Sequence, residues 1–389
     1  MTLPKITIVL GNNALGQTAQ TADGVCGLIS SGASVVSKVQ VDTPYLITSL
    51  AQAVTLGILS TGANAHAHRN IADFYEVAGT GAQLYIMLST ASMELLVLNT
   101  NLQYAHALQN FAQGKIKVLA LTAVKPGSPT IAAGLWDRVH LAAQNAQVLA
   151  VAMTALYRPL RVIVDGVAYN GIPANLTDYK TAALNRVQIL LTGELSTGNA
   201  DVGKLLGLYA TLPVQRKASR VLNGPAVGMS AAFFTSGDSV DSHASNWEAI
   251  HAKAYVFHKT HVTKAGFYMS SDSMLTADTD DYNTMPRGRV IDKALVLIYG
   301  VLVEKLSDEV EINADGTISL GIIKSWQSEI ETTLNTAMTQ EGEISAVQVL
   351  IDAAQNVIST GKVTVGVRVQ PVGYSDFIDV ELGYTITTV

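Results

Sequence analysis

The chain has 389 residues, of which 48% are hydrophobic and only 14% are charged, and its formal net charge is −6. This composition excludes an intrinsically disordered chain, because disorder needs low hydrophobicity and high charge. The acidic balance, without a run of lysine and arginine, argues against a nucleic-acid-binding protein. The length predicts two or three domains.

Three further features limit the class of protein. No run of about 18 uninterrupted apolar residues occurs, so we expect no membrane span and no direct membrane insertion. Cys26 is the single cysteine, which excludes an internal disulfide and indicates a reducing compartment. A chain so poor in charge is expected to bury much of its surface against copies of itself.

The first 24 residues are expected to form a strand-like arm and a linker. Residues 5–10 are rich in β-branched side chains and follow Pro4, and they predict a strand that carries Ile6, Ile8 and Leu10. The linker that follows, residues 11–24, is rich in Gly, Asn, Gln and Thr.

Residues 25–250 predict an α/β body. The body starts at residues 25–29, and we expect helices at residues 44–57, 66–78, 92–113, 136–157 and 175–184, and four strands at 84–88, 116–121, 161–165 and 186–191. Continuous apolar strands separated by helices are typical of a parallel sheet that is covered on both faces.

Residues 251–373 predict a second domain of the α+β class. Paired strands are expected at 254–257 and 266–269, helices at 288–306 and 322–338, and strands at 348–351 and 362–370. Asp315-Gly316 is a hairpin signal between two short apolar segments.

The last segment, residues 374–389, predicts a second arm. Its apolar positions recur with a period of mostly two, which is typical of a strand with one apolar face. These positions are Phe377, Ile378, Val380, Leu382, Tyr384 and Ile386. A strand at a chain end must pair, because its N–H and C=O groups need partners. Either both arms pair within their own domain, or they add to the sheet edge of a neighbouring subunit.

One segment fits a phosphate-binding loop in part. Residues 198–204 match G-x-x-x-x-G-K and follow a strand, but Leu205 stands where the loop needs Ser or Thr for magnesium. Residues 11–16 have the same glycine spacing, but Gln17 replaces the lysine. We therefore interpret residues 198–205 as an ordinary loop and helix start, with no bound nucleotide.

No metal or catalytic site is expected. His66 and His68 lie two apart on a helix and so face apart, although Asp73 is near. Asp278, Asp280 and Asp281 lack the spacing of a calcium loop. His251, His258 and His261 have no cysteine or carboxylate at a recurrent metal-ligand spacing. Cys26 is interpreted as a small core residue. With no G-x-S-x-G elbow and no cofactor fingerprint, the sequence indicates a protein that is not an enzyme.

Several blocks together resemble a known family. They are residues 23–29, 43–50, 68–75 with 83–88, 212–216 with 220–224, 287–294 and 375–382. In these blocks the chain resembles the contractile tail sheath proteins of Bacteroidetes-type phages and related contractile particles, a family long known as a domain of unknown function.

The resemblance implies a mechanical protein of the virion tail, assembled in the host cytoplasm. Sheath subunits of this kind form stacked hexameric rings around an inner tube protein, between baseplate and tail terminator proteins. A trigger at the baseplate makes the sheath shorten and drive the tube through a cell envelope. The terminal arms of such subunits pair with sheets of neighbours, and no nucleotide or cofactor is used.

The resemblance also implies a tube contact through a helix of the second domain. On the helix expected at 322–338, an apolar stripe would face its own domain, leaving Lys324, Ser328, Glu331 and Asn335 free to meet the tube. An ordinary surface helix is the alternative.

Two other classes remain open. One is another self-assembling virion protein, such as a tube or capsid component, although tubes are usually shorter and mostly β. The other is an α/β nucleotide-binding enzyme, which would need a complete phosphate loop or an acid/base pair.

Overall fold

The computed structural model describes residues 22–384, apart from the side chains of Ala22 and Asn101. The chain divides into two compact units, the first ending at Tyr299 and the second beginning at Gly300. The expected arm residues Ile6, Ile8, Leu10 and Ile386 lie outside the described residues.

The first unit is built around a six-stranded sheet with the strand order β2-β3-β1-β4-β7-β9. β2 is antiparallel to β3, and the other neighbours are parallel. The strands are β1 (Cys26–Ser31), β2 (Tyr45–Ile47), β3 (Leu84–Ser89), β4 (Val118–Thr122), β7 (Arg161–Asp165) and β9 (Val187–Leu190). Every residue of β3, β4 and β7 is buried, which explains the apolar run in the middle of each strand, although β7 begins with Arg161 and ends with Asp165. The predicted α/β body with a parallel sheet is confirmed.

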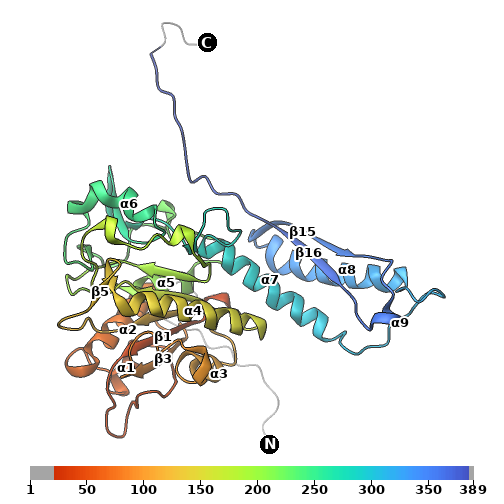
Figure 1. The fold of residues 1–389 in the computed structure, drawn as a ribbon, viewed down its shortest axis with the longest axis horizontal. Helices are drawn as coiled ribbons and strands as arrows, with labels where there is room; N and C mark the ends of the chain where they lie inside the picture. Colours follow the sequence, from red (N-terminus) through yellow and green to blue (C-terminus); the bar gives the residue numbers. More distant parts are fainter. Residues whose placement is uncertain (1–21, 385–389) are drawn as a thin grey trace, which may run out of the picture. The chain divides into compact units, whose positions relative to one another are not determined.

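Helices cover both faces of this sheet (Figure 1). The helices of the unit are α1 (Leu50–Thr55), α2 (Ala65–Ala78), α3 (Ala105–Phe111), α4 (Asp137–Ala155), α5 (Val202–Thr211), α6 (Trp247–His251) and most of α7 (Met285–Val303). Successive side chains of β1 point to opposite faces. Leu28 belongs to the core formed with α2 and α5, whereas Ile29 belongs to the core formed with α4.

Three predicted helices differ from the structure. The helix expected at 92–113 is reduced to α3, because Leu102 and Tyr104 have positive φ angles that interrupt a helix. The helix expected at 175–184 is wrong: the segment forms two short 3-10 turns and β8 (Ala183–Leu184). The helix expected at 44–57 begins only at Leu50, after β2, where the Ser49 side chain accepts a hydrogen bond from the Gln52 N–H.

The paired strands expected at 254–257 and 266–269 are shifted. The hairpin is formed by β12 (His258–His261) and β13 (Lys264–Met269). Residues 254–257 lie beside β9 instead, since the Val256 N–H donates to the Ile189 carbonyl and the Val256 carbonyl accepts from the Leu191 N–H. This pairing extends the first compact unit past residue 250, where the sequence predicts the start of a second domain.

Several very short strands complete the first unit. They are β5 (Ile131–Ala132) with β6 (Leu135–Trp136), β10 (Thr192–Gly193) with β11 (Phe233–Phe234), and β14 (Leu275–Thr276) with β8.

The second unit contains α8 (Leu320–Leu334), β15 (Ile344–Ile351), α9 (Val357–Thr360) and β16 (Val365–Pro371). The predicted hairpin at Asp315-Gly316 is confirmed, because Ile312 and Ile318 bridge antiparallel across it and Gly316 has a φ of 82°. The helix expected at 322–338 continues past Leu334 only as a π-helical turn, Asn335–Thr339.

Candidate assembly surfaces

The loop that fits G-x-x-x-x-G-K in part allows α5 to pack closely against α2. α5 begins within it, and a Cβ at Gly203 would lie 2.1 Å from the carbonyl oxygen of Asn70 on α2. A glycine is therefore needed for the close approach of the two helices. The Lys204 Nζ lies 2.5 Å from Glu76 Oε2, 3.6 Å from Asp73 Oδ1 and 3.8 Å from Glu194 Oε2. A phosphate at this position would meet carboxylates that already neutralise the lysine.

A second polar cluster lies at the carboxyl end of the sheet. Asp165 is fully buried and accepts hydrogen bonds from Thr122 Oγ1 (2.7 Å), Asn199 Nδ2 (2.8 Å) and the Ala200 N–H (2.8 Å). Burial raises the pKa of Asp165 to about 7, although these hydrogen bonds favour its charged form. The carboxyl group attaches the loop before α5 to the sheet.

Several residues that the sequence analysis rejected as metal ligands have partners within the chain. His66 Nε2 lies 2.7 Å from Thr122 Oγ1, and Asp278 pairs with Lys180. Asp280 accepts hydrogen bonds from Asn185 and from the Tyr282 N–H. Across residues 22–384, no group of three or more His, Cys, Asp and Glu side chains is arranged to hold a metal ion. In the same range, no helix has both the length and the apolar character that crossing a membrane requires.

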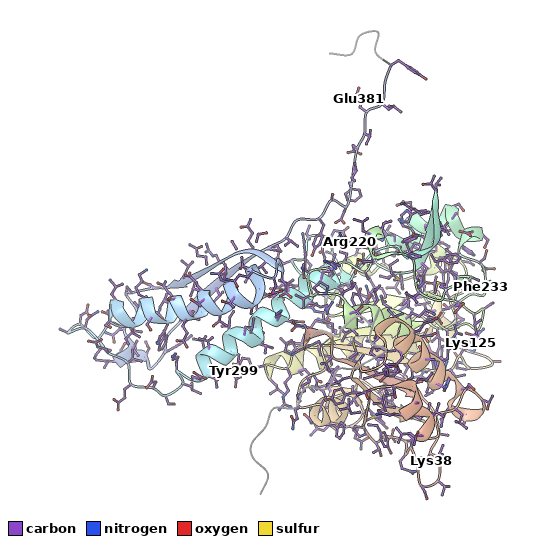
Figure 2. The ribbon with its side chains drawn as sticks, turned by 180° about the vertical axis from the view of Figure 1, so that it is seen from behind. Lys38, Lys125, Arg220, Phe233, Tyr299 and Glu381 are labelled. Atoms are coloured by element: carbon purple, nitrogen blue, oxygen red, sulfur yellow. The ribbon has the colours of Figure 1, made fainter. Side chains whose placement is uncertain are left out.

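The most exposed apolar segment of the described chain is residues 377–384, which we call the C-terminal arm. Phe377, Ile378, Val380 and Leu382 are each at least 77% exposed. Residues 377–384 form no helix or strand, and Figure 2 shows Glu381 on an extended trace. Exposed apolar side chains in succession are typical of a surface that another molecule covers.

The second unit offers a sheet with only two strands. β15 and β16 pair antiparallel, with Val349 opposite Val367, and α8 packs against β15. Among the described residues, neither strand pairs with a third. Such a sheet is marginal alone and its edges are templates for further strands.

The predicted tube-contact residues of α8 fall into two groups. Lys324, Ser328 and Asn335 are exposed. Glu331 is half-buried, and its Oε1 accepts a hydrogen bond of 3.0 Å from the Val349 N–H. Glu331 is thus engaged by β15 of its own unit, because it lies on the side of α8 that turns toward the strand.

Sequence reasoning missed one contact at this sheet. Gln327 donates a hydrogen bond of 3.1 Å to the Val349 carbonyl, a contact that no local pattern predicts. The strand expected at residues 362–370 is present as β16, where Val365, Val367 and Val369 alternate with a period of two.

Comparisons with known proteins agree with this architecture. Residues 3–273 match the family described as DUF2586, N-terminal domain, and residues 281–388 match DUF2586, C-terminal domain. No curated protein matches the chain in sequence.

Solved structures share the fold over nearly the whole of both chains. The contracted helical sheath of the anti-feeding prophage aligns with a TM-score of 0.66 and 15% identity, covering 98% of this chain and 99% of that chain. The baseplate of the same prophage aligns with a TM-score of 0.62 and 16% identity, covering 99% and 100%. The contracted sheath complex of PVC, an extracellular contractile injection system, aligns with a TM-score of 0.60 and 13% identity, covering 99% and 98%. The expected resemblance to sheath proteins is confirmed at the level of the fold.

Proposed function

We propose that this chain, which belongs to the DUF2586 family, is a structural subunit of a contractile sheath. The observation that carries the proposal is the shared fold, which extends over 98% of this chain and 99% of a contracted sheath chain. In the proposed assembly, subunits form stacked hexameric rings around an inner tube. Contraction drives the tube through a cell envelope.

The subunit needs no nucleotide in this function. The lysine that suggests a phosphate loop, Lys204, is 4% exposed and is surrounded by carboxylates. We place the energy for contraction in interfaces between subunits, which differ between an extended and a contracted lattice.

The two terminal arms connect neighbouring subunits. The apolar positions of the C-terminal arm require cover, and strand addition supplies both cover and hydrogen-bond partners. Residues 371–373, Pro-Val-Gly, begin at the last residue of β16 and would let the arm stay paired while the subunit body turns. Residues 5–10 are proposed to pair in the same manner.

The partners that follow from this role are further copies of the chain, an inner tube protein, and baseplate and terminator proteins. The proposed location is the tail of a virion or related particle, after assembly in the host cytoplasm.

Deletion of residues 375–389 tests the proposal. We expect a folded chain that remains in small species, because the segment that links subunits is gone. Negative-stain microscopy and sedimentation should find long hollow cylinders for the full chain and none for the shortened chain.

A matched variant keeps the length of the arm. Ile378→Ser, Val380→Ser and Leu382→Ser together remove its apolar face, and we expect the same loss of cylinders. Full-length cylinders from both variants, or compact small oligomers from the unchanged chain, would contradict the proposed function.

A further inference from the structure

The two strands of the second unit differ at their outer edges. The main-chain N–H and C=O of Val349, in β15, are both bonded to side chains of α8, namely Glu331 and Gln327. These two residues lie four apart and so share one face of the helix. Together they occupy the main-chain groups of Val349, which lie in the middle of the β15 edge, between the outward groups of Val347 and Ile351.

The register identifies the groups at the outer edge of β16. Val349 lies opposite Val367, and opposed residues of an antiparallel pair alternate between hydrogen-bonded and non-hydrogen-bonded classes. Because the main-chain groups of Val349 point toward α8, this pair is non-hydrogen-bonded. Val365 and Val369 share the class of Val367, since they lie two residues away. The N–H and C=O groups of all three valines therefore point away from β15, along the outer edge of β16.

This outer edge is open. Among residues 22–384, no side chain bonds the outward groups of β16 in the way that Gln327 and Glu331 bond those of Val349. The side chains of β16 alternate, with half-buried valines on one face and the exposed Arg368 on the other.

The C-terminal arm has the complementary alternation. If Ile378, Val380 and Leu382 lie beside the valines of β16, then Asp379 and Glu381 lie on the face that carries Arg368. The opposite orientation would put two carboxylates beside the valines. Apolar contact and charge thus favour the same orientation.

We propose that Gln327 and Glu331 close the edge of β15 to strand addition and so direct the C-terminal arm of a second copy to the outer edge of β16. The inference rests on the proposed role of the arm in the sheath and adds the edge that receives it. In the isolated chain the arm stays exposed rather than pairing with its own β16, so the occupant is the arm of another copy.

Disulfide cross-linking in the assembled full-length chain tests the choice of edge. Arg368 and Gln348 lie opposite each other on the same face of the sheet. An arm beside β16 lies about 4.8 Å from Arg368 and about twice as far from Gln348. A disulfide needs Cα atoms within about 7 Å, so only the nearer position is within reach.

Glu381→Cys is therefore combined with Arg368→Cys in one chain and with Gln348→Cys in another. A second pair of chains carries Asp379→Cys in place of Glu381→Cys, so that both registers of the arm are covered. On a non-reducing gel we expect a ladder of covalent oligomers for the Arg368→Cys chains and monomer for the Gln348→Cys chains. The native Cys26 is buried and remains.

Removing the two blocking side chains tests their role. In the Gln348→Cys chains, Gln327→Ala with Glu331→Ala should produce covalent oligomers, because the edge of β15 is then open. Ser328→Ala, an exposed change on the same helix, should leave only monomer. Glu331→Gln should also leave only monomer, since its amide oxygen still accepts from the Val349 N–H.

Each outcome has a separate meaning. Oligomers from Gln348→Cys in the otherwise unchanged chain would overturn the choice of edge but not the arm's role. An unchanged gel after removal of both blocking side chains would overturn their role. Monomer from every cysteine pair would overturn the proposed function of the arm itself.

Discussion

The ammonium group of Lys204 holds three segments of the first unit together. It bonds Glu76 of α2 at 2.5 Å and the Val227 carbonyl at 3.0 Å, and it belongs to α5. Lys204→Ala would remove the cation that contacts Glu76, Asp73 and Glu194, and would leave Arg69, 3.8 Å from Asp73, as the remaining cation at the buried carboxylate. We expect the free energy of unfolding to fall by roughly 2–4 kcal/mol, discounted for the partial exposure of Glu76.

Urea unfolding of Lys204→Ala measures this loss, with the exposed Lys125→Ala as control. Added ATP with magnesium should leave the unfolding midpoint of the unchanged chain where it is. A midpoint that rises with nucleotide, and that no longer rises in Lys204→Ala, would restore the phosphate-loop interpretation.

The carboxyl group of Asp165 makes stability depend on pH. Burial raises its pKa from 3.8 to about 7, so between these values the folded chain binds a proton that the unfolded chain releases. Lowering the pH through this window therefore stabilises the fold. Asp165→Asn cannot titrate.

We expect the unfolding free energy of the unchanged chain, minus that of Asp165→Asn, to increase by about 1 kcal/mol for each pH unit lowered between pH 7 and pH 5. The half-buried His66 and the buried His258, whose pKa values are lowered to about 4, mainly by burial, act in the opposite direction. Both are present in the two chains, so the part of their effect that does not depend on Asp165 cancels in the difference. A difference that stays constant with pH would contradict the prediction.

At the scale of elements, α8 has one face that contacts its own unit and one face that is exposed. Ile323, Ile330 and Leu334 are buried against the rest of the second unit, and Glu331 bonds β15. Lys324, Ser328 and Asn335 remain as the exposed residues of the predicted tube contact. Charge reversal at Glu331 would disturb its own sheet, so a test of the tube contact must avoid that residue.

Lys324→Glu with Ser328→Glu provides such a test. If this face meets the tube, we expect folded subunits that form sheaths lacking a tube, because two carboxylates replace a cation and a hydroxyl at the contact. Electron microscopy of particles counts filled and empty sheaths. Glu341→Lys, an exposed charge reversal beyond the helix, is the control. Normal tube-filled particles from the double variant would assign the contact to another surface.

At the scale of the whole molecule, the surface agrees with a chain that functions as a polymer. Only 14% of the residues are charged, and α4 exposes Leu141, Val148 and Val151 by 42%, 58% and 51%. Exposed apolar side chains along one helix are a cost for an isolated chain in water. In the proposed sheath, subunit interfaces would bury these side chains. We propose that the same interfaces supply the free energy of contraction.

The sequence by itself determined the parallel α/β body, the hairpin at Asp315-Gly316 and the alternating pattern of the C-terminal arm. These features depend on local periodicity: burial on both faces makes strands such as β3 continuously apolar, and burial on one face makes them alternate. The prediction from sequence was wrong where an unusual backbone conformation interrupts an element. Positive φ angles at Leu102 and Tyr104 ended the helix expected at 92–113.

Only the tertiary structure decided what individual polar residues do. Lys204 meets Glu76 across 128 positions of the chain, and Glu331 meets Val349 across 18. Neither contact can be read from the periodicity of the sequence, because a contact between distant segments depends on how the chain folds to bring those segments together. For the same reason a lysine that fits a phosphate motif belongs to a packed ion cluster, and a glutamate expected at the tube lies on the edge of β15.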